Sequence, residues 1–363
     1  MEQSKVNLTR VITYAGAFIA FLIGSGFATG QEVMQYFSAY GWMGVAGIVV
    51  VFLLFLYVGW DFVVTGHEQK FSNSGDIYRH LCGKWIGSFF DYFSVLFIYM
   101  SFIVMIGGTG ATVEQQYGLS PWIGAIVMGG VVATTVIFGL DRILDILGRI
   151  GPVIVVLTVT LGILAILRNP QGLGTVDAVI PNLELKTAST NWFLASLSYV
   201  GFCMLWLAGF MSLMGSTSKN LKEVTSGAML GALGFSLALA IIALGFMANI
   251  EFLAGSMVPT LKMADSIHPA FATIFSVIVL AGIYTTAVPL LWQASARFTD
   301  GKSMRFKVVT LVLMAIGVFV GLRVPFDQLV NIIYVINGYV GFILLLFMVI
   351  NTYKRISGKS KAG

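Results

Sequence analysis

The chain has little charge. Only 10% of its 363 residues are Asp, Glu, Lys or Arg, whereas soluble domains carry about 25%, so a water-facing surface and a soluble enzyme are excluded. Its two cysteines, Cys82 and Cys203, lie far apart, and its three histidines have no ligand spacing, so neither a disulfide framework nor a metal knuckle is indicated. The sequence contains no H-E-x-x-H, G-x-S-x-G or P-loop motif. We therefore predict neither an enzyme nor a resident cofactor.

Apolar residues and glycine fill the chain instead. Hydrophobic residues make up 58%, and glycine occupies 41 positions. Glycine is more frequent in membrane helices than in soluble ones, and a spanning helix needs about 20 mostly apolar residues. These features predict an all-α integral membrane protein with ten transmembrane helices. The predicted spans are Val11–Phe37, Trp42–Thr65, Phe89–Val113, Pro121–Leu140, Ile150–Leu167, Trp192–Met214, Thr225–Ile250, Ala270–Ala296, Phe306–Leu322 and Gln328–Tyr353.

Positive charges orient these helices. With an even number of spans both termini lie on one side, and 17 of the 21 Lys and Arg residues fall on that side. The other four are Arg168, Lys186, Lys262 and Arg323. The positive-inside rule then places both termini in the cytoplasm and the protein in the plasma membrane. Because topology accounts for the net charge of +5, we predict no nucleic-acid partner.

Glycines interrupt the first predicted span near its middle, in Ile23-Gly24-Ser25-Gly26-Phe27-Ala28-Thr29-Gly30. Each Gly costs about 1 kcal/mol relative to Ala in a helix, and irregular backbone at membrane depth occurs only where it lines a cavity or is buried in protein. The polar Thr29, Gln31 and Glu32 that follow favour the start of a half-helix, whose free N–H groups suit an anion. Close packing of helices through small residues is the alternative.

The sixth span is the place to expect a matching break. Transporters built as inverted repeats carry discontinuous helices at corresponding positions, and ten spans divide into repeats of about 11–168 and 192–353 within one domain, 1–363. The segment Ser198-Tyr199-Val200-Gly201-Phe202-Cys203 holds one glycine among polar and aromatic residues. We predict a second discontinuity there, with helix packing as the alternative.

The eighth span places several oxygen atoms on one face. Thr285 and Thr286 follow Gly282 by three and four residues, and Pro289 has no N–H to bond the carbonyl of Thr285. Hydroxyl and carbonyl oxygens are the ligands that a small hard cation such as sodium requires. The alternative is that both hydroxyls bond back to the preceding helical turn.

The Ile23–Phe27 segment resembles the unwound first-helix motif of the amino acid–polyamine–organocation superfamily. Ten helices, cytoplasmic termini and breaks in helices 1 and 6 are similar to its five-plus-five inverted repeat, the LeuT-type fold. More narrowly, the chain looks like a YkvI-type membrane protein. The resemblance covers the whole chain in topology, and its residue-level support lies in helix 1 and in the helix 8 threonines.

The resemblance implies a site for each ligand. The N–H groups of Ser25, Gly26 and Phe27 would receive a substrate carboxylate, and the carbonyl of Leu22 would accept its ammonium group. Many proton-coupled members place a Lys on helix 5, where this chain has none, which favours sodium. The sodium site would combine helix 1 carbonyls with helix 8 oxygens, and it maps to Ala20, Ile23, Gly282, Thr285 and Thr286.

Further candidates are ionisable or aromatic residues inside the spans. Glu32, just past the first break, would gate the site or couple protons, or else cap the half-helix. Asp61 near the cytoplasmic end of the second span is a proton relay or an interfacial salt bridge. Tyr99, and Tyr199 together with Gly201 and Phe202, would line a substrate pocket or serve packing.

The sequence thus predicts an ion-coupled secondary transporter, with sodium favoured, for an amino acid or similar small zwitterion. It would work by alternating access, with the substrate between the breaks in helices 1 and 6. The alternatives are proton coupling through Glu32 and a nutrient sensor that binds the same solute without moving it. The expected partners are the lipid bilayer and the small-molecule substrate, and the sequence does not indicate an oligomeric state.

Overall fold

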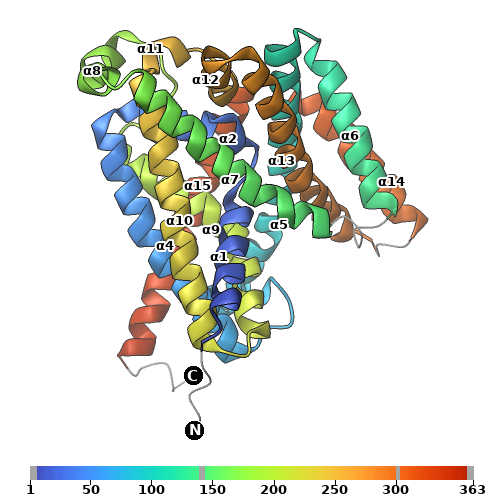
Figure 1. The fold of residues 1–363 in the computed structure, drawn as a ribbon. Coiled ribbons are helices and arrows are strands. Elements are labelled where there is room, and N and C mark those ends of the chain that lie inside the picture. Colours follow the sequence, from blue (N-terminus) through green and yellow to red (C-terminus); the bar gives the residue numbers. More distant parts are fainter. Residues whose placement is uncertain (1–5, 139–143, 300–302, 358–363) are drawn as a thin grey trace.

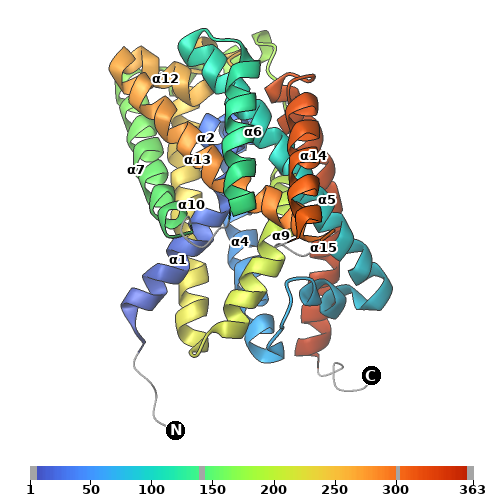
Figure 2. The same cartoon turned by 90° about the vertical axis from the view of Figure 1, so that its right-hand side faces the viewer.

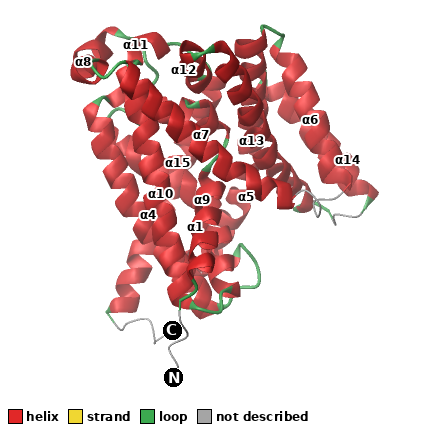
Figure 3. Cartoon of the chain, in the orientation of Figure 1, coloured by secondary structure: helices red, strands yellow, loops and turns green. Residues whose placement is uncertain are grey.

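The chain folds into a bundle of helices joined by short loops, and no strand occurs among the residues described (Figure 3). The computed structural model describes residues 6–138, 144–299 and 303–357. The end of the fourth predicted span, at 139–140, and five of the cations used for orientation lie outside these ranges. Those cations are Lys5, Arg142, Lys302, Lys359 and Lys361.

The helices follow one another closely along the chain (Figure 1). The first half contains α1 Leu8–Leu22, α2 Ser25–Thr29, α3 Gln31–Tyr36, the 3-10 helix η1 Ser38–Tyr40, α4 Trp42–Gln69, α5 Asp76–Tyr117, α6 Pro121–Phe138, α7 Leu144–Arg168, α8 Gly172–Val179 and the 3-10 helix η2 Ile180–Asn182. The second half contains α9 Trp192–Thr217, α10 Leu221–Ala248, α11 Ile250–Leu253, α12 Pro259–Ile267, α13 Pro269–Ala296, α14 Met304–Gly321 and α15 Phe326–Ile356.

Eight of the described helices are long and apolar enough to cross a membrane: α4, α5, α6, α9, α10, α13, α14 and α15. A ninth span results if Val153–Arg168 and Gly172–Asn182, which meet at 91°, are taken together. The first predicted span consists of α1, α2 and α3, and α1 alone has 15 residues, fewer than the roughly 20 that a span requires. The count of ten therefore stays a prediction.

Local sequence explains where several helices begin and bend. The side chains of Asn7 and Asn191 accept hydrogen bonds from backbone N–H groups in the first turns of α1 and α9, as N-cap residues do. α5 starts at Asp76, well before the predicted Phe89, because a short helical segment precedes Gly83. Gly83 has φ 74° and ψ −179°, a conformation that favours glycine, so the chain turns there before the long span.

α9 lies at the centre of the bundle. It packs against α4, α15 and α5, and 78% of its most apolar stretch is buried, compared with 33% for α6 and 28% for α14. Figures 1 and 2 show α6 and α14 at the periphery. The start of α1 and the end of α15 lie at the same end of the bundle, which we call the terminal end, and α8, α11 and α12 lie at the opposite end (Figure 1).

The break predicted in the sixth span is wrong, because α9 is a single helix from Trp192 to Thr217. Its glycine serves close packing instead. A Cβ atom on Gly201 would lie 2.0 Å from the carbonyl oxygen of Gly338, and one on Gly341 would lie 1.8 Å from the carbonyl oxygen of Gly201. The backbones of α9 and α15 therefore meet where only glycine fits, as small residues allow at membrane helix crossings.

Candidate functional site

The first span is interrupted between α1 and α2. α1 ends at Leu22, Ile23 and Gly24 have extended backbone, and α2 starts at Ser25. The carbonyls of Ala20 and Leu22 accept no hydrogen bond from any described residue. The interruption therefore leaves acceptor groups free in the interior, where unsatisfied carbonyls are costly unless a ligand uses them.

A second irregularity separates α2 from α3 at Gly30. Its φ of 87° lies in the left-handed region, which an L side chain rarely adopts. A Cβ atom there would also lie 2.4 Å from the Phe246 ring of α10. Gly30 thus turns α3 so that its first residues, Gln31 and Glu32, point back into the bundle, where both are buried.

The oxygens expected from helices 1 and 8 meet at the first interruption. The Thr286 hydroxyl donates to the Ile23 carbonyl at 3.3 Å and lies 3.2 Å from the Gly282 carbonyl, and the Thr285 hydroxyl donates to Gly282 at 2.7 Å. Both hydroxyls thus bond back to the preceding turn, and Thr286 also links α13 to α1. Four of the five positions assigned to sodium are in contact here.

A cavity of about 350 Å³ begins at the same place. The remaining predicted sodium position, Ala20, lines it together with Ile23, Gly24, Thr285 and Thr286. Its other walls come from α1, α5, α7, α9 and α13, and the lining positions on α1, α9 and α13 run toward the terminal end of each helix. Two of these residues, Phe21 and Phe210, stack at 4.3 Å. The cavity therefore lies between the interruption and the terminal end of the bundle.

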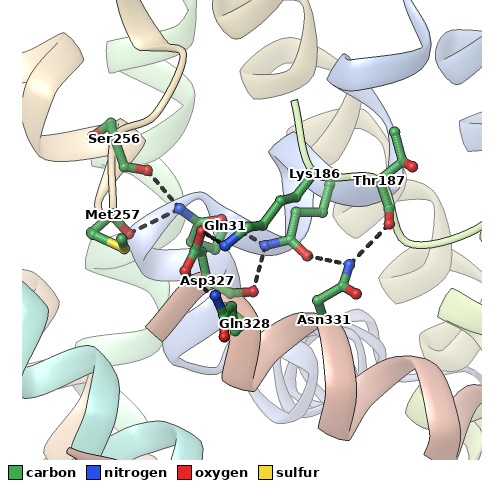
Figure 4. Close-up of polar contacts among 9 residues, drawn as sticks. Gln31, Lys186, Thr187, Ser256, Met257, Asp327, Gln328 and Asn331 are labelled. Carbon is green, nitrogen blue, oxygen red and sulfur yellow. Dashed lines mark hydrogen bonds and ion pairs between the residues drawn. The ribbon is translucent and has the colours of Figure 1, made fainter. Parts of the chain in front are cut away.

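At the opposite end, a network of polar contacts joins four segments (Figure 4). Gln31 of α3 donates to the carbonyls of Ser256 and Met257 at 2.7 and 3.1 Å. Gln35 donates to the Asp327 carbonyl at 2.9 Å, and its own side-chain oxygen accepts from Asn331 at 3.0 Å.

An ion pair between Lys186 and Asp327 adds the loop before α9 to this network. Asn331 also donates to the carbonyl of Thr187 in that loop, at 2.9 Å. These contacts hold α3 against α15 and close the side of the site that faces away from the cavity. This closure was not predicted from the sequence, because its residues come from distant segments.

Aromatic side chains surround Glu32 on the inner face of α3. We call this group the Glu32 cage, and its members are Glu32, Tyr36, Tyr199, Phe202, Trp206 and Tyr334. Glu32 is 1% exposed, its Oε2 accepts from the Tyr199 hydroxyl at 3.5 Å, and its Oε1 has no partner among the described residues. Tyr199 and Phe202 were predicted, whereas Tyr36, Trp206 and Tyr334 were missed.

Several predicted residues lie apart from this centre. Tyr99 faces α14, where its hydroxyl donates to the Leu313 carbonyl at 2.9 Å, and Gly201 lies in the α9–α15 crossing. Asp61 pairs with Arg355 at 2.8 Å and accepts from Thr352 at 3.2 Å. Of the two interpretations of Asp61, the interfacial salt bridge is therefore the one that the geometry matches.

Replacing Arg355 with glutamine is expected to lower the free energy of unfolding by about 3 kcal/mol, because it strips the ion pair from a buried carboxylate. The Asp61 side chain is only 3% exposed. Glu68→Gln is the matched control, since Glu68 is 49% exposed and 3.9 Å from Arg355. Thermal unfolding in detergent measures both variants, and equal losses would contradict the assignment. Adding Asp61→Asn to Arg355→Gln should recover part of the loss.

Two curated proteins are similar to this chain over most of its length. No protein-family model matches it. It is 20% identical over 358 residues to the uncharacterized membrane protein YkvI of Bacillus subtilis (strain 168), covering 94% of each chain. It is 24% identical over 348 residues to the uncharacterized protein YyaD of the same organism, covering 92% of this chain and 95% of YyaD.

Solved structures of transporters share the fold. An inward-facing structure of Mhp1 matches with a TM-score of 0.64 and 14% identity, over 92% of this chain and 73% of Mhp1. MhsT in complex with L-phenylalanine matches with 0.63 and 15%, over 93% and 88%. A mutant of the Eremococcus coleocola manganese transporter matches with 0.60 and 14%, over 97% and 80%. The chain therefore has the LeuT-type fold.

Proposed function

We propose that the chain is a sodium-coupled secondary transporter for an amino acid or a similar small solute with an ammonium group. The observation that carries this proposal is the meeting of the α1 interruption with the Gly282, Thr285 and Thr286 oxygens of α13 at the head of a cavity. Interrupted helices whose free carbonyls face a mid-membrane site are how transporters of this type hold their coupling ion and substrate.

Alternating access accounts for the asymmetry of the two ends. The cavity lies toward the terminal end, which the positive-inside rule assigns to the cytoplasm, and the network around Gln31 and Gln35 closes the other end. The similarity to an inward-facing structure of Mhp1 supports assigning the same state to this chain. Transport would require the polar network to open as the cavity closes.

The test is uptake into proteoliposomes that contain the purified chain. A sodium gradient should drive accumulation of a radiolabelled solute, and an equal potassium gradient should not. Uptake that follows a proton gradient and ignores sodium would overturn sodium coupling and assign the coupling role to Glu32. A solute that raises the unfolding temperature but never enters the vesicles, even by exchange with unlabelled solute, would identify a sensor instead of a transporter.

A further inference from the structure

The Glu32 cage holds an unusual concentration of buried polar atoms that lack partners. Eleven such side-chain atoms occur among the described residues, and five of them lie here: Glu32 Oε1, the hydroxyls of Tyr36 and Tyr334, Trp206 Nε1, and the hydroxyl of the adjacent Ser25. Folded proteins pair the large majority of buried polar atoms. The Tyr334 hydroxyl lies close to that of Ser25, and the Tyr36 hydroxyl lies close to Ser198, without a direct hydrogen bond in either pair. We therefore expect a bound molecule to supply the partner that Glu32 Oε1 lacks and to complete the bonding of these hydroxyls.

Aromatic rings pack around these polar atoms. The ring centres of Tyr36 and Tyr199 are 5.3 Å apart, those of Tyr199 and Phe202 are 5.0 Å apart, and Phe202 stacks on Tyr334 at 4.8 Å. Trp206 completes the wall, 5.7 Å from Tyr334. Aromatic faces carry negative partial charge and attract organic cations, most strongly where water is excluded.

The Glu32 carboxylate inside the cage also favours a cation. Glu32 forms no ion pair with any described residue, and its one hydrogen bond is the 3.5 Å contact from Tyr199. A buried carboxylate is costly unless a cation and hydrogen-bond donors accompany it. An ammonium group would supply both of these, and the neighbouring hydroxyl oxygens of Ser25 and Tyr334 would accept hydrogen bonds from its remaining N–H groups.

Glu32 also occupies the place where a substrate carboxylate would bind. A Cβ atom added to Gly26 would lie 2.0 Å from Glu32 Oε1, so the side chain folds back over the start of α2. A second carboxylate brought to Ser25, Gly26 and Phe27 would lie against this one, and like charges at such a distance repel. The chain itself thus provides the anion at this position.

We infer that the substrate is a small organic cation, an amine without a carboxylate on the same carbon, whose ammonium group binds Glu32 within the aromatic cage. This inference rests on the proposed transport function and narrows its substrate class. Trp206 separates the cage from the cavity, since it lines the cavity and packs on Phe202 and Tyr334. The Trp206 side chain is 9% exposed, whereas every other cage residue is at most 1% exposed. The substrate therefore enters the cage by displacing the Trp206 ring.

Two matched sets of compounds test the inference on the full-length protein in detergent. The first set is phenethylamine, L-phenylalanine and 3-phenylpropionate, and the second is isopentylamine, L-leucine and 4-methylpentanoate. Each set keeps one apolar group and varies the charged groups. Binding is measured by tryptophan fluorescence and by the rise in unfolding temperature. We expect at least one amine to bind about tenfold or more tightly than its amino acid, and the carboxylates not to bind.

Two variants assign the effect to Glu32. Glu32→Gln keeps the shape of the side chain and should weaken amine binding about tenfold or more, while amino acid binding stays the same or improves. Glu114→Gln, on the exposed end of α5, is the control and should change neither. Loss of both ligand classes in Glu32→Gln would indicate a merely structural role and overturn the inference.

The remaining outcomes separate this inference from the transport proposal. If amino acids bind as well as amines in the native chain, or if no amine binds, the substrate class is wrong, and sodium-driven uptake decides the transport function independently. If an amine binds through Glu32 but no gradient drives it into vesicles, the substrate class stands and the transport function falls.

Discussion

Replacing Gly341 with alanine is expected to lower the free energy of unfolding by about 1–3 kcal/mol, the cost of overpacking a tight crossing. The new Cβ atom would lie 1.8 Å from the carbonyl oxygen of Gly201 and 2.3 Å from its carbonyl carbon. Both are backbone atoms, so no side chain can rotate away, and α9 and α15 must separate. Because α9 is the central helix, the loss should reach the whole bundle.

Gly130→Ala is the matched control for this prediction. Gly130 lies within α6, and no atom lies within 4 Å of the position of its Cβ, so alanine should be neutral or stabilising by up to about 1 kcal/mol. A thiol-reactive dye measures the unfolding of both variants through Cys203, which is 1% exposed, in a background where Cys82 is replaced by serine. Equal unfolding temperatures for Gly341→Ala and the native chain would refute the close crossing.

The contrast between Gly201 and the glycines of the first span shows what a single sequence can predict. In the first span, Gly24, Gly26 and Gly30 stand together with polar residues after them, and the structure has two irregularities there, at 23–24 and at Gly30. In the sixth span, a break was predicted at the single glycine, Gly201, because this span corresponds to the first span in the inverted repeat. A lone glycine in an apolar helix fits a break and a close crossing equally well, and the deciding residues, Gly338 and Gly341, lie about 140 positions away.

The same limit explains the half of the site that was missed. Thr285 and Thr286 were identified because their spacing from Gly282 is local, and a helix fixes which residues share a face. Tyr36, Trp206 and Tyr334 gather around Glu32 from α3, α9 and α15, and an aromatic residue in a span is usually a packing residue. The available signal was Glu32 itself, since a carboxylate inside a span requires partners. Searching for those partners needs the fold.

Replacing Thr285 and Thr286 together with valine is expected to abolish the sodium dependence of uptake while the protein stays folded. Valine keeps the branched shape and removes both hydroxyls, and with them two of the oxygens that face the α1 interruption. Sodium binds only where enough oxygens replace its water shell, and the three carbonyls that remain, those of Ala20, Ile23 and Gly282, are too few. Uptake in a sodium gradient should fall to the level measured in potassium.

Thr286 also joins α13 to α1 through Ile23, so a purely structural effect must be separated from loss of the ion. The measurement is the rise in unfolding temperature that sodium causes, which a structural defect would leave intact and loss of the ion site would remove. Thr260→Val is the matched control. The Thr260 hydroxyl donates to the Ala28 carbonyl at 2.9 Å, so this substitution removes a comparable link to the first span. A sodium effect that survives in the double variant but disappears in the control would place the ion elsewhere, whereas the opposite result fixes it between α1 and α13.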